Sequence, residues 1–424
     1  MTRERHTKSL PVELAASALV DGWRRRALLA GLVFSVIAFA LAVADHAIDH
    51  VLRAWLLGMT LTFGFAVGGL ALLMLQYCTG GKWGLLLRRP LEAMSRTLPL
   101  VFAYWIVVAG SLKKLYLWAT IVDVSAALNN GLINAAQAHV LAFKRSMLNP
   151  ESFIIVSVVC FVILGYYTWR LNRLSLERDA DSPESAPRWI KRLENISGPG
   201  IVVYAITVSA AAILWIMSLD PAWYSSVYGL LFLIGQGYQA LALAIIAVIS
   251  LSKAEPYKTV LRQSEQHGLG NLAFAFVMLN IYLAFSQFLI IWSGNLPDEI
   301  PWYLDRMRGH WEVILTLDVL FQWLIPFTLL LSRDLKRNKK RLLRVCQWMV
   351  FARAFDLFWL IEPNFKDAAR NLHFSWGILE YAAVPAAMMA FWVADFCAQL
   401  QKRPLAQSSD PQLAELKGAE NVEA

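Results

Sequence analysis

Long apolar segments recur along this chain from residue 27 almost to its C-terminus, and they constrain its fold more than any other feature. A helix that crosses a bilayer needs about 20 mostly apolar residues. With 58% hydrophobic and 17% charged residues, the chain also lies outside the usual composition of soluble domains. The expected spans are 27–44, 54–76, 98–118, 152–171, 199–219, 223–251, 271–293, 311–331, 342–361 and 376–397. We therefore expect an all-α polytopic membrane protein with about ten transmembrane helices.

The distribution of lysine and arginine gives the expected orientation. If the N-terminus is cytoplasmic, the inner segments hold 29 of these residues and the outer segments hold 9, while Arg353 lies within a span. Basic loops favour the cytoplasmic side of a membrane, so we expect both termini in the cytoplasm. The net charge of +8 then reflects topology and contacts with lipid headgroups. We expect no nucleic-acid partner.

Three regions are expected, and the largest is divided by a linker. The charged, proline-containing linker separates two halves, and each half supplies one four-helix bundle, with the first and last spans flanking the pair. The first span is expected to stay uncleaved, because cleavage would leave an odd number of spans. The expected regions are a cytoplasmic N-terminal segment (1–26), the membrane domain (27–397, with halves at about 54–171 and 199–361 and the linker at 172–198) and a disordered cytoplasmic tail (398–424).

Polar side chains within the expected spans are candidates for a functional site, because such groups are costly in a bilayer. Asp318 and Gln322 lie one turn apart on the eighth span, and Asp318 is expected about 10 Å below the outer surface. Arg353 and Asp356 share one face of the ninth span at a similar depth. Gln287 reaches about the same level on the seventh span. Together these residues predict a polar pocket that opens outward.

Two interpretations of this cluster remain open from the sequence. The Arg353–Asp356 pair could serve only to hold two helices together. Alternatively, the cluster forms a pocket for protons or for a quinol headgroup, with Asp318 as a carboxyl group that has no partner in its own span. A secondary transporter is the alternative from another class. Transporters favour broken helices near the midplane, whereas these spans look continuous apart from Pro326 and Pro385.

The loop after the seventh span has an unusual composition. Gly294, Asn295 and Pro301 are residues that fix the course of a loop backbone. Trp302 and Tyr303 follow, and such amphipathic rings are typical of the headgroup layer. We therefore expect this loop at the outer membrane surface, close to the polar pocket.

The sequence predicts no redox centre, no metal site and no catalytic residues within this chain. Cys78, Cys160, Cys346 and Cys397 are scattered without a C-x-x-C pair, and all seven histidines fall in tails, loops or span ends. Walker A, G-x-S-x-G and H-E-x-x-H motifs are also absent from the sequence. If the protein takes part in electron transfer, we expect the redox centres in other chains.

Several segments resemble one family of membrane proteins. They are 76–84 (QYCTGGKWG), 88–93 (RRPLEA), 219–226 (LDPAWYSS), 284–288 (AFSQF), 294–303 (GNLPDEIPWY) and 331–334 (LSRD). Together they are similar to the second NrfD-like (ActF-type, "quinone-binding subunit 2") membrane subunit of alternative complex III, a quinol:cytochrome c oxidoreductase. The resemblance covers roughly residues 20–400 and is most specific at 283–304.

This resemblance implies ten helices in two four-helix bundles, located in the bacterial inner (plasma) membrane. The implied partners are an iron–sulfur subunit, multihaem and monohaem cytochrome c subunits and a sister NrfD-like subunit. Haem c and iron–sulfur clusters would lie in those partners, and quinol is the one small ligand that this chain could meet. The implied function is an integral subunit of a respiratory oxidoreductase that supplies a scaffold together with a proton path or a quinol-proximal pocket. A quinol site of its own is the alternative.

The sequence departs from the family pattern at three polar positions. The family often has histidine where this chain has Tyr77 and Gln322, and lysine where it has Asn271. If those histidines carry protons in relatives, this chain either lacks that chemistry or carries it out at Asp318, Arg353 and Asp356.

Overall fold

The computed structural model describes residues 13–45, 48–121, 123–130, 135–365 and 377–405. Throughout these ranges the regular structure is helical, which confirms the expected all-α polytopic membrane fold. The long helices are α1 (Glu13–Asp45), α2 (Ile48–Thr79), α3 (Lys82–Ser95), α4 (Leu98–Gly110), α9 (Pro150–Ala180), α10 (Ala186–Trp215), α11 (Tyr228–Ser250), α13 (Gln263–Gly294), α18 (Lys339–Ile361) and α19 (Gly377–Gln401). One further span is built from three consecutive pieces, which are α15 (Trp311–Asp318), the π-helical segment η3 (Val319–Leu324) and α16 (Ile325–Leu331).

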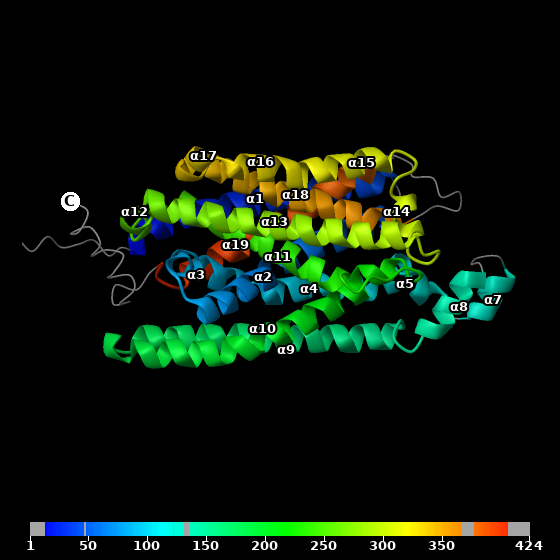
Figure 1. The fold of residues 1–424 in the computed structure, drawn as a ribbon, viewed down its shortest axis with the longest axis horizontal. Helices are drawn as coiled ribbons and strands as arrows, with labels where there is room; N and C mark the ends of the chain where they lie inside the picture. Colours follow the sequence, from blue (N-terminus) through cyan, green and yellow to red (C-terminus); the bar gives the residue numbers. More distant parts are fainter. Residues whose placement is uncertain (1–12, 46–47, 122, 131–134, 366–376, 406–424) are drawn as a thin grey trace, which may run out of the picture.

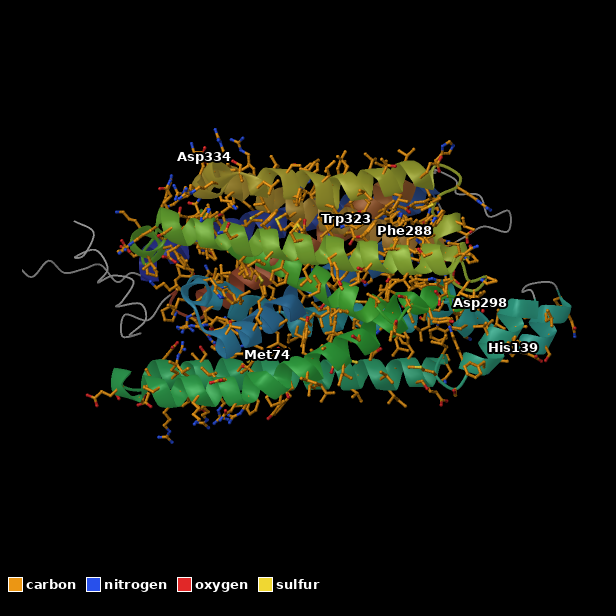
Figure 2. The ribbon with its side chains drawn as sticks, in the orientation of Figure 1. Met74, His139, Phe288, Asp298, Trp323 and Asp334 are labelled. Atoms are coloured by element: carbon orange, nitrogen blue, oxygen red, sulfur yellow. The ribbon has the colours of Figure 1, made fainter. Side chains whose placement is uncertain are left out.

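Short helices connect these spans. They are α5 (Leu112–Leu115), α6 (Leu117–Thr120), α7 (Val124–Asn129), α8 (Ala135–Lys144), η1 (Pro183–Ser185), η2 (Met217–Leu219), α12 (Tyr257–Val260), α14 (Pro301–Asp305), α17 (Arg333–Arg337) and η4 (Glu362–Asn364). Figure 2 places Asp334 of α17 at one end of the bundle and Asp298 towards the other, with Phe288 and Trp323 between them.

In the described part of the chain, nine segments are long and apolar enough to cross a membrane. The remaining expected span is α18, which runs beside the others in the bundle (Figure 1). It is less apolar because it carries Arg344, Arg353 and Asp356. Figure 1 also shows that the described chain begins and ends at the same end of the bundle, as an even number of crossings requires.

Two groups of helices meet at α2 and α11. In the first group α2, α3–α4, α9 and α10 pack together, and in the second α11 and α13 pack with α18 and the α15–η3–α16 span. α2 contacts α11 directly, while α1 pairs with α19 against α2. The most apolar stretch of α2 is 94% buried and that of α1 only 11%, so α2 is a core helix and α1 faces the lipid.

Small residues and glutamines join α2 to α11. A Cβ atom at Gly68 would lie 2.3 Å from the main-chain oxygen of Gln236, which shows how closely the two backbones approach. Gln239 donates a hydrogen bond from Nε2 to the Leu61 carbonyl at 2.9 Å, and Gln236 Oε1 accepts one from the Tyr204 hydroxyl at 3.0 Å. These contacts hold α11 against α2 through Gly68 and Gln239, and against α10 through Gln236.

The third span differs from the expected 98–118. It runs from Lys82 to Gly110, so most of the basic segment left between the expected spans 54–76 and 98–118 is instead the largely buried helix α3. The charges within α3 find partners inside the protein, since Arg89 pairs with Glu92 at 2.8 Å and also with Asp179 of α9. Arg403, just beyond α19, lies 3.0 Å from the same Glu92 carboxylate. This network allows a charged segment to be helical and buried.

Two expected boundaries are also displaced. The linker predicted at 172–198 is mostly helical, because α9 continues to Ala180 and α10 begins at Ala186. The helices extend beyond the apolar core because polar residues can continue a helix outside the bilayer. At the termini, α1 begins within the predicted segment 1–26 and α19 ends at Gln401, while 1–12 and 406–424 lie outside the described residues.

A glycine-to-alanine pair tests the contact between α2 and α11. Gly68→Ala is expected to destabilise the protein by about 1–3 kcal/mol, because the added methyl group overlaps the α11 backbone. Gly110→Ala is the matched control, since a Cβ atom there meets nothing within 4 Å. Thermal unfolding in one detergent measures both. Equal unfolding temperatures for the two variants would contradict the close contact.

Candidate functional site

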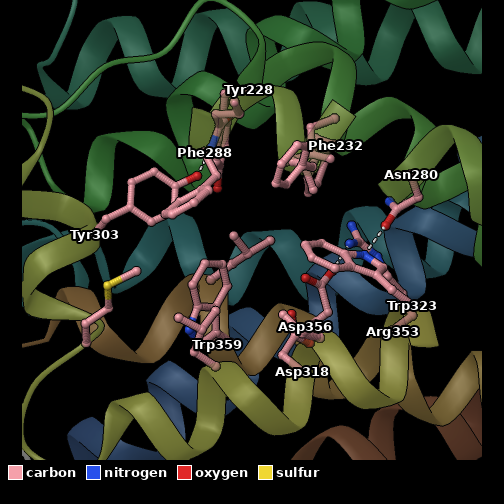
Figure 3. Close-up of a pocket in the computed structure, with 18 residues that line it drawn as sticks. Tyr228, Phe232, Asn280, Phe288, Tyr303, Asp318, Trp323, Arg353, Asp356 and Trp359 are labelled. Atoms are coloured by element: carbon pink, nitrogen blue, oxygen red, sulfur yellow. Dashed lines mark hydrogen bonds and ion pairs between the residues drawn. The ribbon is translucent and has the colours of Figure 1, made fainter. Parts of the chain in front are cut away.

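A pocket lies within the second helix group, between α11, α13, α18 and the α15–η3–α16 span. Its cavity volume is about 290 Å³, and its lining is mainly aromatic and aliphatic, with a few polar groups (Figure 3). The aromatic lining residues are Tyr228, Phe232, Phe285, Phe288, Tyr303, Trp323 and Trp359. An apolar pocket with a small number of placed polar groups is the usual form of a small-molecule site.

The structure brings together four of the five residues predicted for this site. Asp318, Arg353, Asp356 and Gln287 all line the pocket. Gln322 does not, although it is buried, and neither its side-chain oxygen nor its nitrogen has a hydrogen-bond partner among the described residues. It lies on the π-helical segment η3, which has more residues per turn than an α-helix. Gln322, four residues after Asp318, is therefore not on the same helix face as Asp318.

Arg353 and Asp356 form a buried ion pair on α18, three residues apart as the sequence predicts. Their side chains are only 3% and 13% exposed. A Cβ atom at Gly235 of α11 would lie 2.5 Å from Cζ of Arg353, so the absence of a side chain there leaves room for the guanidinium. The position of this glycine beside the charge shows that it shapes the pocket.

Asp318 occupies the last position of α15, directly before the π-helical segment. Its side chain is 2% exposed, and its Oδ1 atom has no hydrogen-bond partner among the described residues. Figure 3 shows it next to Asp356 on one wall of the pocket. Two carboxyl groups therefore face the single guanidinium of Arg353. One of them is balanced by the arginine, and the other needs a proton or a ligand donor to avoid an uncompensated buried charge.

The π-helical turn gives this span its irregular shape. Pro326 lacks the N–H group that an α-helix would use to bond the Gln322 carbonyl, four residues earlier. The Phe321 carbonyl accepts a hydrogen bond from Trp348 Nε1 at 3.0 Å, which draws this turn onto α18. Short π-helical segments inside α-helices are frequent at functional sites. Pro326 was the available sequence signal for this irregularity.

A polar face on α13 completes the lining. Gln287 Nε2 donates to the Tyr303 hydroxyl, and its Oε1 accepts from Ser225 Oγ, each at 3.2 Å. Two turns earlier, Asn280 Oδ1 accepts from Trp323 Nε1 at 3.0 Å. Sequence reasoning missed Asn280, although its spacing of seven residues from Gln287 places both amides on one helix face.

The loop after α13 covers one end of the pocket, the end at which a polar opening was expected. Trp302 and Tyr303 are only 3% and 5% exposed, so their rings pack against protein. Trp302 stacks on Trp223 with ring centroids 4.5 Å apart, and Tyr303 lines the pocket. Asn295 does not line it. That residue has φ 45° and ends α13, a left-handed conformation that asparagine tolerates better than most residues.

Arg306 binds this loop to the interior of the protein through its guanidinium. Sequence reasoning missed this residue. Its Cζ atom lies 3.5 Å from the centroid of the Trp302 ring. Its guanidinium donates to the carbonyls of Trp302 and Leu360 at 3.1 and 3.2 Å and to Asn364 Oδ1 at 3.0 Å. Burial lowers the pKa of Arg306 to about 10, so the side chain remains charged at neutral pH.

The pocket instead opens sideways, towards the membrane. α13 packs on η3, α16 and α17 but makes little contact with α15. A gap therefore lies between α13 and α15, on the N-terminal side of the π-helical segment. The lining residues at this gap are exposed, with Phe285 53% and Val319 36% accessible. An apolar gap in a membrane-facing surface admits molecules dissolved in the bilayer.

Comparison with known proteins gives no match to this sequence, either among family models or among curated proteins. The pocket is therefore interpreted from its own residues. It combines an aromatic lining, a lateral opening and a buried group of two carboxyl groups with one arginine. This arrangement can hold a small amphipathic molecule and accept a proton from it.

A pair of arginine variants tests the loop that covers the pocket. Arg306→Gln is expected to lower stability by about 3 kcal/mol, because it removes charge-assisted hydrogen bonds and leaves buried carbonyl groups unpaired. Arg308→Gln, two residues later and exposed, should change stability by less than about 0.5 kcal/mol. Thermal unfolding in detergent distinguishes them. Similar small effects would show that Arg306 does not hold the loop.

Proposed function

We propose that this chain is an integral subunit of a quinol-oxidising respiratory membrane complex, in which its pocket takes up protons at the Asp318–Arg353–Asp356 group. The observation that supports this most strongly is the group of two buried carboxyl groups that share one guanidinium in a membrane helix bundle. Ionisable groups in that setting are characteristic of proton relays. The motif resemblance at 283–304 supports the respiratory context.

Charge balance explains how the group handles a proton. Arg353 compensates one carboxylate through its ion pair with Asp356. Asp318 then has no cation of its own within the pocket lining and can gain or lose a proton while the neighbouring pair stays in place. Its unpartnered Oδ1 atom gives an incoming hydroxyl group an acceptor. Proton exchange at Asp318 therefore needs no rearrangement of the helices.

Electrons take a different route in this proposal. Oxidation of a quinol releases protons and electrons together, and the electrons pass to iron–sulfur and haem centres in partner subunits. This chain contributes the scaffold and the proton-accepting pocket. We infer a cytoplasmic location for both termini from the excess of basic residues in the predicted inner segments.

A second candidate function is a quinol-binding site within this chain itself. The lateral gap at Phe285 and Val319 favours it, because quinols reach their sites from the bilayer. The headgroup would lie among the aromatic rings with one hydroxyl near Asp318. Retention of a quinol analogue by the purified chain without its partners would support this candidate over proton transfer alone.

Isolation of the complex tests the proposed context. A tagged chain purified in a gentle detergent is expected to bring down haem-bearing and iron–sulfur subunits together with quinol:cytochrome c activity. Haem staining and mass spectrometry of the co-purified chains provide the readout. A lone protein without haem in the eluate would contradict the respiratory proposal and favour a secondary transporter.

The proton-accepting role is tested by replacing one carboxyl group. Asp318→Asn keeps the size of the side chain but cannot take up a proton, so quinol oxidation by the complex should fall by about a hundredfold with assembly retained. Asp298→Asn, an exposed carboxyl group in the loop near the pocket, is the control and should keep full activity. Unchanged activity in Asp318→Asn would exclude this residue as the acceptor.

A further variant tests whether the position of the Arg353 guanidinium matters when every charge is kept. Gly235→Ala leaves every charge in place but displaces the end of the Arg353 side chain, because the added methyl group would overlap the guanidinium. It is expected to lower activity and shift its pH dependence while the complex still assembles. Gly268→Ala, where a Cβ atom meets nothing within 4 Å, is the matched control.

A further inference from the structure

A second hollow lies on the surface of the first helix group, between α4 and α9 and next to the end of α19. Its volume is about 720 Å³. Its walls are largely apolar, with Phe102, Phe161 and Gly165 among them. Val162 and Trp169 on the same wall are 65% and 54% exposed, so the hollow is a groove open to the surroundings of the bundle.

One end of this groove is strongly basic. Arg96, Arg173 and Arg403 line it, and no carboxylate does. Arg403 has an acidic partner in Glu92 at 3.0 Å, and Arg173 has one in Glu177 at 2.9 Å. These contacts leave donor groups of both guanidinium groups free for a further acceptor.

Arg96 differs from the other two because its contacts are neutral. It donates to Asn172 Oδ1 at 2.8 Å and to the Gln399 carbonyl at 2.5 Å. Its Nε atom is buried and has no hydrogen-bond partner among the described residues. Among the same residues, no carboxylate lies at ion-pair distance from Arg96. Glu92 and Asp395 compensate the Arg96 charge only from beyond ion-pair distance, so the basic end retains the capacity to bind a further anion.

The two parts of the groove are arranged like the two parts of a phospholipid. Trp169 lies one turn before Arg173 on α9, with the Arg173 guanidinium 5.5 Å from its ring centroid, an arrangement that suits the boundary between headgroups and acyl chains. Towards the membrane interior, the apolar wall follows Phe161 and Val162 of α9 and Phe102 of α4. The arginines occupy the end of the bundle that the basic residues assign to the cytoplasmic leaflet.

We propose that this groove binds an anionic phospholipid, with the phosphate on Arg96, Arg173 and Arg403 and one acyl chain along the apolar wall beside Gly165. The three guanidinium groups select an anionic headgroup over a zwitterionic one, because arginine and phosphate form charge-assisted hydrogen bonds. The site is distinct from the pocket of the second helix group. It ties α4, α9 and the end of α19 together through one lipid.

The probe for this site is phosphatidylglycerol, added to the purified full-length protein with its associated chains after mild delipidation. Native mass spectrometry should show tighter binding of phosphatidylglycerol than of phosphatidylcholine. Arg173→Gln is expected to weaken phosphatidylglycerol binding by about tenfold, the loss of one charge-assisted contact. Arg170→Gln, three residues earlier and outside the groove, is the matched control and should keep the affinity of the unmodified protein.

A second variant tests the acyl-chain part without touching a charge. Gly165→Phe is expected to fill the groove and reduce phosphatidylglycerol retention, whereas Gly198→Phe should not, and a Cβ atom meets nothing within 4 Å at either position. Equal retention of the two lipids, or equal loss in Arg170→Gln and Arg173→Gln, would overturn the proposal. A photo-crosslinker placed at Gly165 that captures a transmembrane helix of another chain instead of lipid would overturn it as well.

Discussion

The guanidinium of Arg353 is the charge around which the second helix group is arranged. A cation inside a bilayer is costly unless it has a partner and its hydrogen-bonding capacity is used. Asp356 supplies that partner from the same helix, and Gly235 of α11 supplies the space. Asp318 then completes the group from the π-helical span. Removing the arginine would leave two neighbouring carboxyl groups without compensation, so the position of the pocket depends on this one side chain.

The packing of the remaining helices brings this group to a membrane-accessible position. α11 is held against α2 by close backbone contact at Gly68, and the same helix presents Gly235 to the pocket on another face. At one end of the cavity, Arg306 and Trp302 hold the loop over it, while α13 and α15 separate at the side. The cavity is thus covered at the end near this loop, while its lining is exposed at the side of the bundle. A molecule soluble in the bilayer fits that geometry better than one arriving from water.

The sequence predicts much of this because membrane helices follow simple rules. Apolar length identified the spans, and the spacing of Arg353 and Asp356 placed both on one helix face near Asp318. Gln322 was misplaced because the prediction assumed a regular α-helix, whereas the span contains a π-helical turn. The burial of Trp302 was not predicted because its partner, Arg306, lies in a loop whose fold the sequence does not reveal. The charged α3 was left outside the expected spans because one of its neutralising contacts, Asp179, lies on another helix.

Infrared difference spectroscopy of the purified complex tests the central claim most directly, because it detects individual carboxyl groups as they gain or lose a proton. On addition of quinol, we expect a change in the carbonyl-stretch region that shifts in D₂O and disappears in Asp318→Asn. A spectrum from Asp318→Asn with the same carboxyl bands as the unmodified protein would contradict the account. It would show that the proton is taken up elsewhere and that the buried group holds the helices together without exchanging protons.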